Sequence, residues 1–303
     1  MKFRTGIEGS FFLLITLISA LSVLFIIGFI FWTAAPVLEK EGIGFLTGTV
    51  WNYEEHTYGA FYFIVGTLIM TVVTMLIAVP LGLLTAIYLA EWAPGPVEKI
   101  IRPAIELLVG IPSVVYGIFG FFVLEKFFRN TVDPAIDGLL GWIPIFHDPD
   151  PGSGTGILLA STILTIMVLP TIVALSQEAL RSVPSEYREA SLAIGANKWE
   201  TIKKVIVPAA FAGIVTSVIL AMMRAMGETM AVVMVIGNSA KVPTSILDSG
   251  YAMTSKILND IGYYIAEPEP KSALFALAAV LFCIEIVFVF AARLVSRHVN
   301  MRR

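Results

Sequence analysis

Six long apolar runs constrain the fold of this sequence more than any other feature. Each run holds at least 18 mostly apolar residues, enough for a helix to cross a hydrocarbon layer about 30 Å thick. Apolar residues make up 57% of the 303 residues and charged residues only 14%, which excludes an ordinary soluble domain. The sequence therefore predicts an all-α, polytopic membrane protein with six transmembrane helices, near residues 11–35, 60–90, 101–124, 155–178, 209–237 and 272–294.

The first apolar run follows a basic start and so resembles a secretory signal peptide. It extends from Phe11 to Trp32, whereas the apolar core of a signal peptide has only about 7 to 15 residues. We interpret it as a retained anchor. Residues 1–59 then form the anchor helix and first outer loop, and residues 60–303 form a transmembrane domain that contains a long cytoplasmic loop at 184–206.

The distribution of basic residues predicts the orientation of the chain in the membrane. Thirteen Lys and Arg residues lie on the side of the two termini, and six lie in the loops on the opposite side. Because basic residues close to a span stay in the cytoplasm, both termini are predicted to be cytoplasmic. The basic residues are spread over several short loops and the net charge is −3, which argues against nucleic-acid binding.

Cysteine and metal chemistry are not expected. Cys283 is the single cysteine and lies inside the last span, so no disulfide framework forms. His147 stands beside Asp148 and Asp150, but this spacing fits no common metal site.

The loop at 184–206 has the pattern of two short helices with a break between them. Pro184 suits a first helical turn, and Gly195 suits the end of that helix. Asn197 followed by Glu200 predicts a capping box at the start of a second helix. Such an amphipathic hairpin is suited to docking into a groove of a soluble partner; the alternative is a helix that lies on the lipid surface.

This loop also carries a family motif. The segment EASLAIGANKWETIKKVIVP resembles the EAA motif of ABC importer permeases, with Glu189, Ala190 and Ser191 at the E-A-A positions, then Gly195 and finally Pro208. Ser191 departs from the pattern, which has alanine there. The resemblance implies the type I ABC importer (MetI-like) permease fold, and it implies that the loop is the coupling helix that docks on an ATPase subunit.

The chain has no nucleotide-binding loop of its own. Its only Lys followed by Ser or Thr is Lys271, which Pro270 precedes, so the phosphate-binding pattern G-x-x-x-x-G-K-[ST] is missing. We therefore expect no cofactor on this chain, no enzymatic activity of its own, and ATP to be used by a partner subunit.

Arg224 and Glu228 lie inside the fifth apolar run. On a continuous helix, residues four apart share a face, and a charge at mid-membrane costs roughly 2.5–3.5 kcal/mol unless it faces the protein interior. Gly227 beside them opens space. The pair either neutralises itself within the helix or forms an anion site. In the second case the Arg224 guanidinium donates to an oxyanion, and Glu228 accepts the O–H of hydrogen phosphate, which sulfate lacks.

A second resemblance narrows the family. RAMGETMAVVMVIGN (224–238) and GIPSVVYGIFGFFVL (110–124) are similar to the permease subunits of phosphate-specific ABC importers, and to the PstC branch more than to the PstA branch. The resemblance implies that Arg224 and Glu228 matter for phosphate passage, and we expect Gly227, Thr229 and Ser113 to lie on the same path. It also implies a prokaryotic inner membrane location and three partners, namely a PstA-like permease, a PstB-like ATPase dimer and a PstS-like phosphate-binding protein.

Several alternatives remain open on the sequence. The cargo could be molybdate or phosphonate, the chain could be a passive anion channel or exchanger, or it could be a membrane scaffold. The segment GIPSVVYGIFG (110–120) either packs tightly against neighbours or lines the path and bends. Glu106 and Glu285 are expected to be satisfied structural carboxylates, and the hydroxyls of three threonines either bond their own helix or face the path: Thr67, Thr71 and Thr74.

Overall fold

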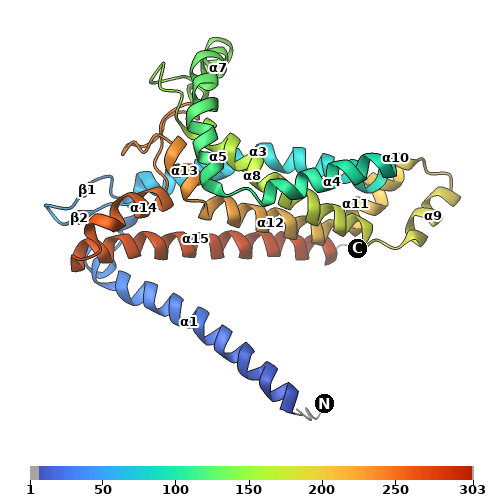
Figure 1. Cartoon of the computed structure of the whole chain (residues 1–303), viewed down its shortest axis with the longest axis horizontal. Helices are drawn as coiled ribbons and strands as arrows, with labels where there is room; N and C mark the ends of the chain where they lie inside the picture. The colour runs from blue at the N-terminus through green and yellow to red at the C-terminus, as the bar shows by residue number, and fades with distance from the viewer. Residues whose placement is uncertain (1–6, 302–303) are drawn as a thin grey trace. The chain divides into compact units, whose positions relative to one another are not determined.

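The computed structural model describes the backbone of residues 7–301 and the side chains of residues 9–294. Helices dominate it, and one small hairpin pairs β1 (Trp51–Asn52) antiparallel with β2 (Thr57–Tyr58) (Figure 1). Five basic residues used to predict the orientation have side chains outside the described part: Lys2, Arg4, Arg297, Arg302 and Arg303.

Within the described residues, four helices are each long and apolar enough to cross a membrane. They are α1 (Ile7–Glu41), α3 (Phe61–Ile87) with its π-helical continuation η1 (Tyr88–Trp92), α8 (Ile157–Arg181) and α15 (Pro268–Met301). Two further spans are bent: Gly95–Val109 with Ser113–Leu140, at 94°, and Lys198–Ala209 with Phe211–Gly227, at 68°. Counting each bent pair as one span gives the six spans predicted from the sequence.

Shorter elements complete the chain. The bent spans contain α4 (Gly95–Val109), α5 (Ser113–Phe119), η2 (Gly120–Leu124), α6 (Glu125–Phe127), η3 (Phe128–Val132), α7 (Asp133–Leu140), α10 (Lys198–Thr201), η5 (Ile202–Ile206), α11 (Val207–Ala209) and α12 (Phe211–Gly227). The remaining elements are α2 (Gly44–Thr47), η4 (Pro144–Phe146), α9 (Ser185–Ala193), α13 (Met230–Val235) and α14 (Met253–Tyr264).

The chain divides into two compact units. The first contains residues 1–60 together with 260–282, and the second contains residues 61–259 and 283–303. In the first unit the Lys40 ammonium pairs with Glu269, and Tyr53 stacks on Tyr264 with ring centroids 3.7 Å apart. Burial, followed by the charges of nearby carboxylates such as Glu269, raises the pKa of Tyr58 to about 12. Residues 260–282, which the sequence analysis placed with the transmembrane domain, thus pack with the N-terminal segment.

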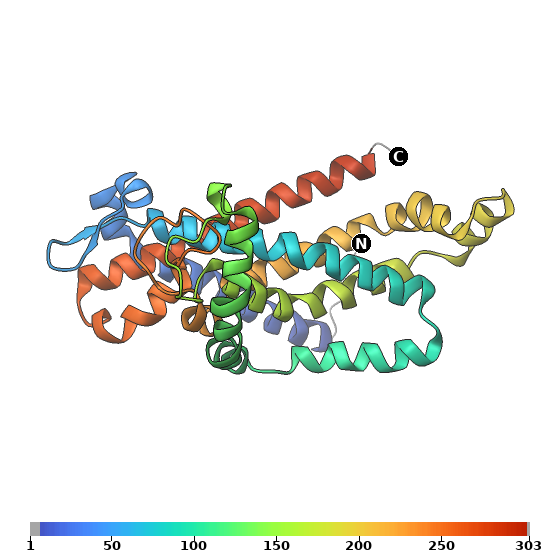
Figure 2. The same ribbon diagram turned by 90° about the horizontal axis from the view of Figure 1, so that it is seen from above.

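The second unit is built around α8, which packs against α3 and α12 (Figure 2). Close approach is needed at Gly82 of α3, where an added Cβ would lie 2.6 Å from Cγ2 of Ile172 on α8. The hydroxyls of Thr67, Thr71 and Thr74 each donate to a carbonyl four residues earlier in α3, at 2.7–2.8 Å. These three hydroxyls therefore donate to carbonyls of their own helix, which was the first of the two alternatives left open by the sequence.

The glycine-rich segment 110–120 packs tightly. An added Cβ at Gly117 would lie 3.1 Å from Cα of Ala231 on α13, and one at Gly120 would lie 2.1 Å from Cδ1 of Ile163 on α8. The 94° bend falls between α4 and α5, and the Tyr116 hydroxyl donates across it to the Leu108 carbonyl at 2.9 Å. These contacts favour the packing interpretation for Gly117 and Gly120.

A helix break and a cytoplasmic hairpin as candidate functional sites

The structure corrects the predicted geometry of Arg224 and Glu228. Helix α12 ends at Gly227, and Glu228 has an extended backbone with φ −69° and ψ 132°. The two residues are therefore not on one helical face, and no ion pair joins them within the described part of the chain. The interpretation as a self-neutralising intrahelical pair is wrong.

Glu228 departs from helical geometry because its carboxylate and its carbonyl form hydrogen bonds outside α12. Its Oε1 accepts from the backbone N–H of Thr229 at 3.1 Å and of Ala231 at 3.3 Å, which caps the start of α13. Its carbonyl accepts from the Thr254 hydroxyl at 2.9 Å. A carboxylate is favourable at a helix N-terminus, where N–H groups lack partners. Sequence reasoning missed Thr254 because it lies 26 residues further along the chain.

Arg224 is half-buried in the last turn of α12. Among the described side chains it has no hydrogen-bond or ion-pair partner. Its position near the carbonyl end of the helix is electrostatically favourable. Five guanidinium N–H donors nevertheless remain available for a ligand or for another subunit.

The sequence analysis expected two carboxylates, Glu106 and Glu285, to have hydrogen-bond or ion-pair partners, but the structure pairs only one of them. Glu106 does have a partner, because its Oε1 lies 2.9 Å from Nε of Arg102. Glu285, in contrast, has no hydrogen-bond or ion-pair partner among the described residues. Its Oε1 lies 4.0 Å from the position a Cβ on Gly227 would occupy, and apart from the two neighbouring residues and the backbone of α12, no other described atom comes that close to this position. Gly227 therefore leaves open space beside an unpaired carboxylate.

The other predicted path residues lie around the same break. The Thr229 hydroxyl donates to the Gly227 carbonyl at 3.2 Å. Ser113 is half-buried and begins α5, and α5 packs against α13 through Gly117. The structure thus places the helix of Ser113 beside the break, but shows no hydrogen bond between Ser113 and Arg224 or Glu228.

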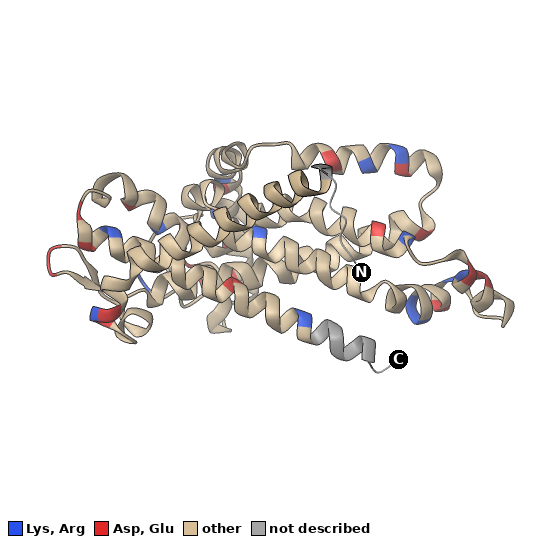
Figure 3. Ribbon diagram, turned by 90° about the horizontal axis from the view of Figure 1, so that it is seen from below, with Lys and Arg blue, Asp and Glu red and all other residues tan. Residues whose placement is uncertain are grey.

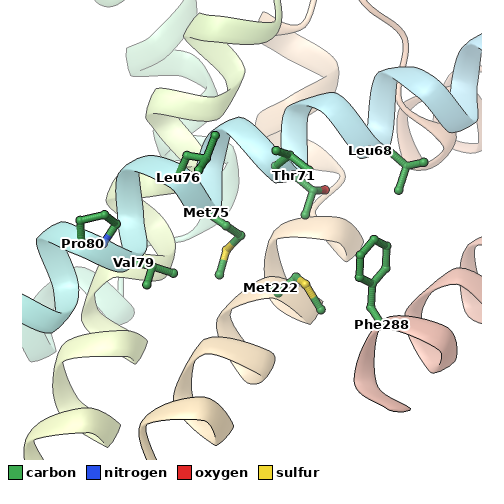
Figure 4. A pocket seen from close by; sticks show the side chains of 9 residues that line it. Leu68, Thr71, Met75, Leu76, Val79, Pro80, Met222 and Phe288 are labelled. Atoms are coloured by element: carbon green, nitrogen blue, oxygen red, sulfur yellow. The ribbon is translucent and has the colours of Figure 1, made fainter. Parts of the chain in front are cut away.

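A prominent groove of about 380 Å³ lies between α3, α12 and α15 (Figure 4). Its lining is apolar except for Thr71, whose hydroxyl is already bonded within α3. The lining consists of Leu68, Thr71, Val72, Met75, Leu76, Val79, Pro80, Met222 and Phe288. Arg224 is not part of it, so this groove has no charge to hold an anion.

The hairpin at 184–206 forms as predicted. Gly195 has φ +88°, a left-handed conformation that ends α9 and suits glycine. Asn197 Oδ1 accepts from the Glu200 N–H at 2.9 Å, and Glu200 Oε2 accepts from the Asn197 N–H at 3.1 Å, which is the expected capping box. Pro208 lies in α11, before the 68° bend.

The motif residues of the hairpin divide into exposed and buried ones. Glu189, Ala190 and Gly195 are exposed. Ser191 is buried, and its hydroxyl lies 2.9 Å from that of Thr201, which ties the two arms together. The departure from alanine at this position therefore has a structural reason.

The hairpin also exposes large apolar side chains. Ile194 is 87% exposed, and Tyr187 and Leu192 are more than half exposed. Figure 3 shows charged residues gathered near the ends of the long helices, with few along their middle. An ordered hairpin that leaves apolar groups uncovered beside charged ones fits a docking surface for another protein.

Taken together, bent membrane spans, a polar break between α12 and α13 and an ordered hairpin at 184–206 define an all-helical transport permease. The fold is that of ABC importers. The chain is similar to a subunit of the MetNI methionine ABC transporter in an inward-facing conformation, with a TM-score of 0.56 and 19% identity, over 79% of this chain and 97% of that one.

The chain belongs to the family described as the binding-protein-dependent transport system inner membrane component, whose profile matches residues 78–301. The phosphate transport system permease protein PstC of Mesorhizobium japonicum is 38% identical, over 88% of this chain and 81% of the relative. The probable ABC transporter permease protein YqgH of Bacillus subtilis is 39% identical, over 84% and 77%. The chain is thus a multi-pass inner membrane permease that works with a solute-binding protein and an ATPase subunit, and it is not itself catalytic.

Proposed function

We propose that this chain is the PstC-type permease subunit of an ATP-driven phosphate importer. Similarity to PstC proteins along most of the chain supports phosphate as the cargo. The observation that carries the site is the unpaired, half-buried Arg224 within a span. Because an unpaired charge in a membrane costs roughly 2.5–3.5 kcal/mol, its donors need a partner that the described residues do not supply.

The break between α12 and α13 supports a division of roles between two side chains. The Arg224 guanidinium donates to phosphate oxygens as a planar fork. Glu228 uses Oε1 to cap α13, which leaves Oε2 to accept the O–H of hydrogen phosphate. Sulfate has no such proton, so the site discriminates by hydrogen bonding and not by size. Gly227, Thr229 and Ser113 complete the surroundings of this path.

The partners follow the same proposal. A PstA-like permease supplies the other half of the path and faces Arg224. A PstB-like ATPase dimer docks on the hairpin at the exposed residues Glu189, Ala190 and Gly195. Ser191 and Pro208 belong to the same coupling segment. A PstS-like protein delivers phosphate from outside. ATP binding and hydrolysis on the ATPase then bias the permease between outward-open and inward-open arrangements.

The deciding experiment is uptake by the reconstituted complex. The chain is combined in liposomes with a PstA-like permease, the ATPase and the binding protein, and labelled phosphate is followed with and without ATP. We expect uptake that needs ATP and that excess sulfate or molybdate does not inhibit. Uptake without ATP would indicate a passive channel, and uptake of molybdate in place of phosphate would keep the family but change the cargo.

A further inference from the structure

The cytoplasmic ends of three elements meet at Arg188, a residue of α9. Its Nη2 donates to Oε1 of Glu91 at 2.7 Å, and its Nε lies 3.3 Å from the same oxygen. Glu91 belongs to η1, the π-helical continuation of α3. The side chain of Glu91 is only 9% exposed and that of Arg188 is 26% exposed, so the pair is largely withdrawn from water.

The same guanidinium closes the end of α8. Nη1 of Arg188 donates to the Val183 carbonyl at 2.7 Å, and Nη2 donates to the Leu180 carbonyl at 3.0 Å. The last carbonyls of a helix have no partner inside the helix. A planar guanidinium has five N–H donors in a fixed fork, which is why one side chain can bind a carboxylate and two carbonyls together.

Two further contacts surround the charged pair. Trp92, next to Glu91, stacks on Trp199 of α10, with ring centroids 5.8 Å apart and an interplanar angle of 20°. Beneath them Ala86 of α3 and Leu180 of α8 join a buried apolar cluster with Ile206. Both arms of the hairpin therefore contact η1, the continuation of α3: α9 does so through Arg188, and α10 through Trp199.

We infer that the Arg188–Glu91 pair is the joint through which movement of α9 reaches α3 and α8. The inference rests on the proposed function, in which the ATPase docks on the hairpin. A displacement of α9 moves the spans only if the contacts between them are stiff enough to keep their geometry. A charge-assisted hydrogen bond shielded from water is stiffer than an exposed ion pair, because water competes less for it. Arg188 is a positioning residue, since it acts on the path through α3 and α8.

The test compares transport with ATP hydrolysis in the reconstituted importer. Arg188→Lys keeps the charge but loses the fork, and Glu91→Gln keeps an acceptor but loses the charge. For both variants we expect ATP hydrolysed per phosphate imported to rise about fivefold or more, as for the loss of a typical coupling between sites. The ATPase subunit should copurify in the wild-type ratio.

A matched control lies outside the hairpin. Arg102 pairs with Glu106 four residues later, with its Nε 2.9 Å from Oε1, and its side chain is 56% exposed. Arg102→Gln should leave the ratio of hydrolysis to uptake at the wild-type value, since exposed pairs contribute little. The inference is overturned if Arg188→Lys keeps the wild-type ratio, or if its uptake and hydrolysis fall together because the ATPase is lost from the complex.

Failure of the proposed function would look different. The wild-type complex would then import no phosphate. The joint can still be tested in that case. The measurement is the rise in ATP hydrolysis when the loaded binding protein is added, compared between wild type and Arg188→Lys. Stimulation lost in the variant, with unstimulated hydrolysis kept, supports the joint, and equal stimulation in both contradicts it.

Discussion

Arg224 and Arg188 are both partly buried arginines, but the structure treats them in opposite ways. Arg188 makes hydrogen bonds to one carboxylate and two carbonyls. Arg224 has no hydrogen-bond or ion-pair partner among the described residues. In the proposed function this difference corresponds to two tasks. A side chain that fixes elements relative to each other has its donors filled by the chain itself, whereas a side chain that serves a passing anion keeps its donors free.

The largest effect is expected when Arg188, the arginine that is hydrogen-bonded within the chain, is replaced. Arg188→Ala leaves the buried Glu91 carboxylate without its partner, and removing one member of a buried pair costs about 3 kcal/mol or more. We expect a clear fall in the thermal stability of the purified permease complex in detergent. A variant as stable as wild type would show that the pair contributes nothing to the fold.

Removing the free arginine should change transport and not stability. In Arg224→Gln the charged donors are lost, and a charge-assisted hydrogen bond contributes enough to lower uptake roughly 10- to 100-fold. Thermal stability and ATPase binding should match wild type. Arg102→Gln is the control, because Arg102 belongs to an exposed pair with Glu106. Phosphate uptake retained in Arg224→Gln would place the anion site elsewhere.

Glu228 sharpens the comparison because it caps α13 and, in the proposed function, also accepts a hydrogen bond from phosphate. Glu228→Gln keeps an oxygen that caps α13 but places an N–H₂ donor where Oε2 was, so sulfate should begin to compete with phosphate, on the order of tenfold better than in wild type. Its stability should stay unchanged. Glu228→Ala should lose about 1 kcal/mol through the missing cap.

The measurement is phosphate uptake against a sulfate titration, together with thermal unfolding of each variant. If Glu228→Gln and Glu228→Ala have the same selectivity as wild type, Glu228 is a cap and nothing more.

The smallest expected effect concerns the internal bond of the hairpin. Ser191→Ala restores the alanine of the family pattern but leaves the buried Thr201 hydroxyl without its partner, at a cost of about 1 kcal/mol. Uptake should fall less than twofold, and Ser191→Ala combined with Thr201→Val should recover the stability. A larger defect in uptake than in stability would give Ser191 a direct part in docking.

The sequence by itself determined the features that depend on local chemistry and on the solvent. Long apolar runs must become membrane spans because a hydrocarbon layer satisfies no backbone groups. The hairpin at 184–206 was predictable because its signals, Gly195 and the Asn197–Glu200 box, act within a few residues. The family motif then indicated what such a hairpin does.

Only the tertiary structure decided which charges are paired. Glu228 leaves the helix of Arg224 because the N–H groups of α13 and the hydroxyl of Thr254 offer its carboxylate and its carbonyl better partners. Arg188 and Glu91 are 97 residues apart, and nothing in either segment specifies the other. The physical reason is common to both cases. A buried polar group takes the partners that packing brings to it, and packing between distant segments is decided by the whole fold.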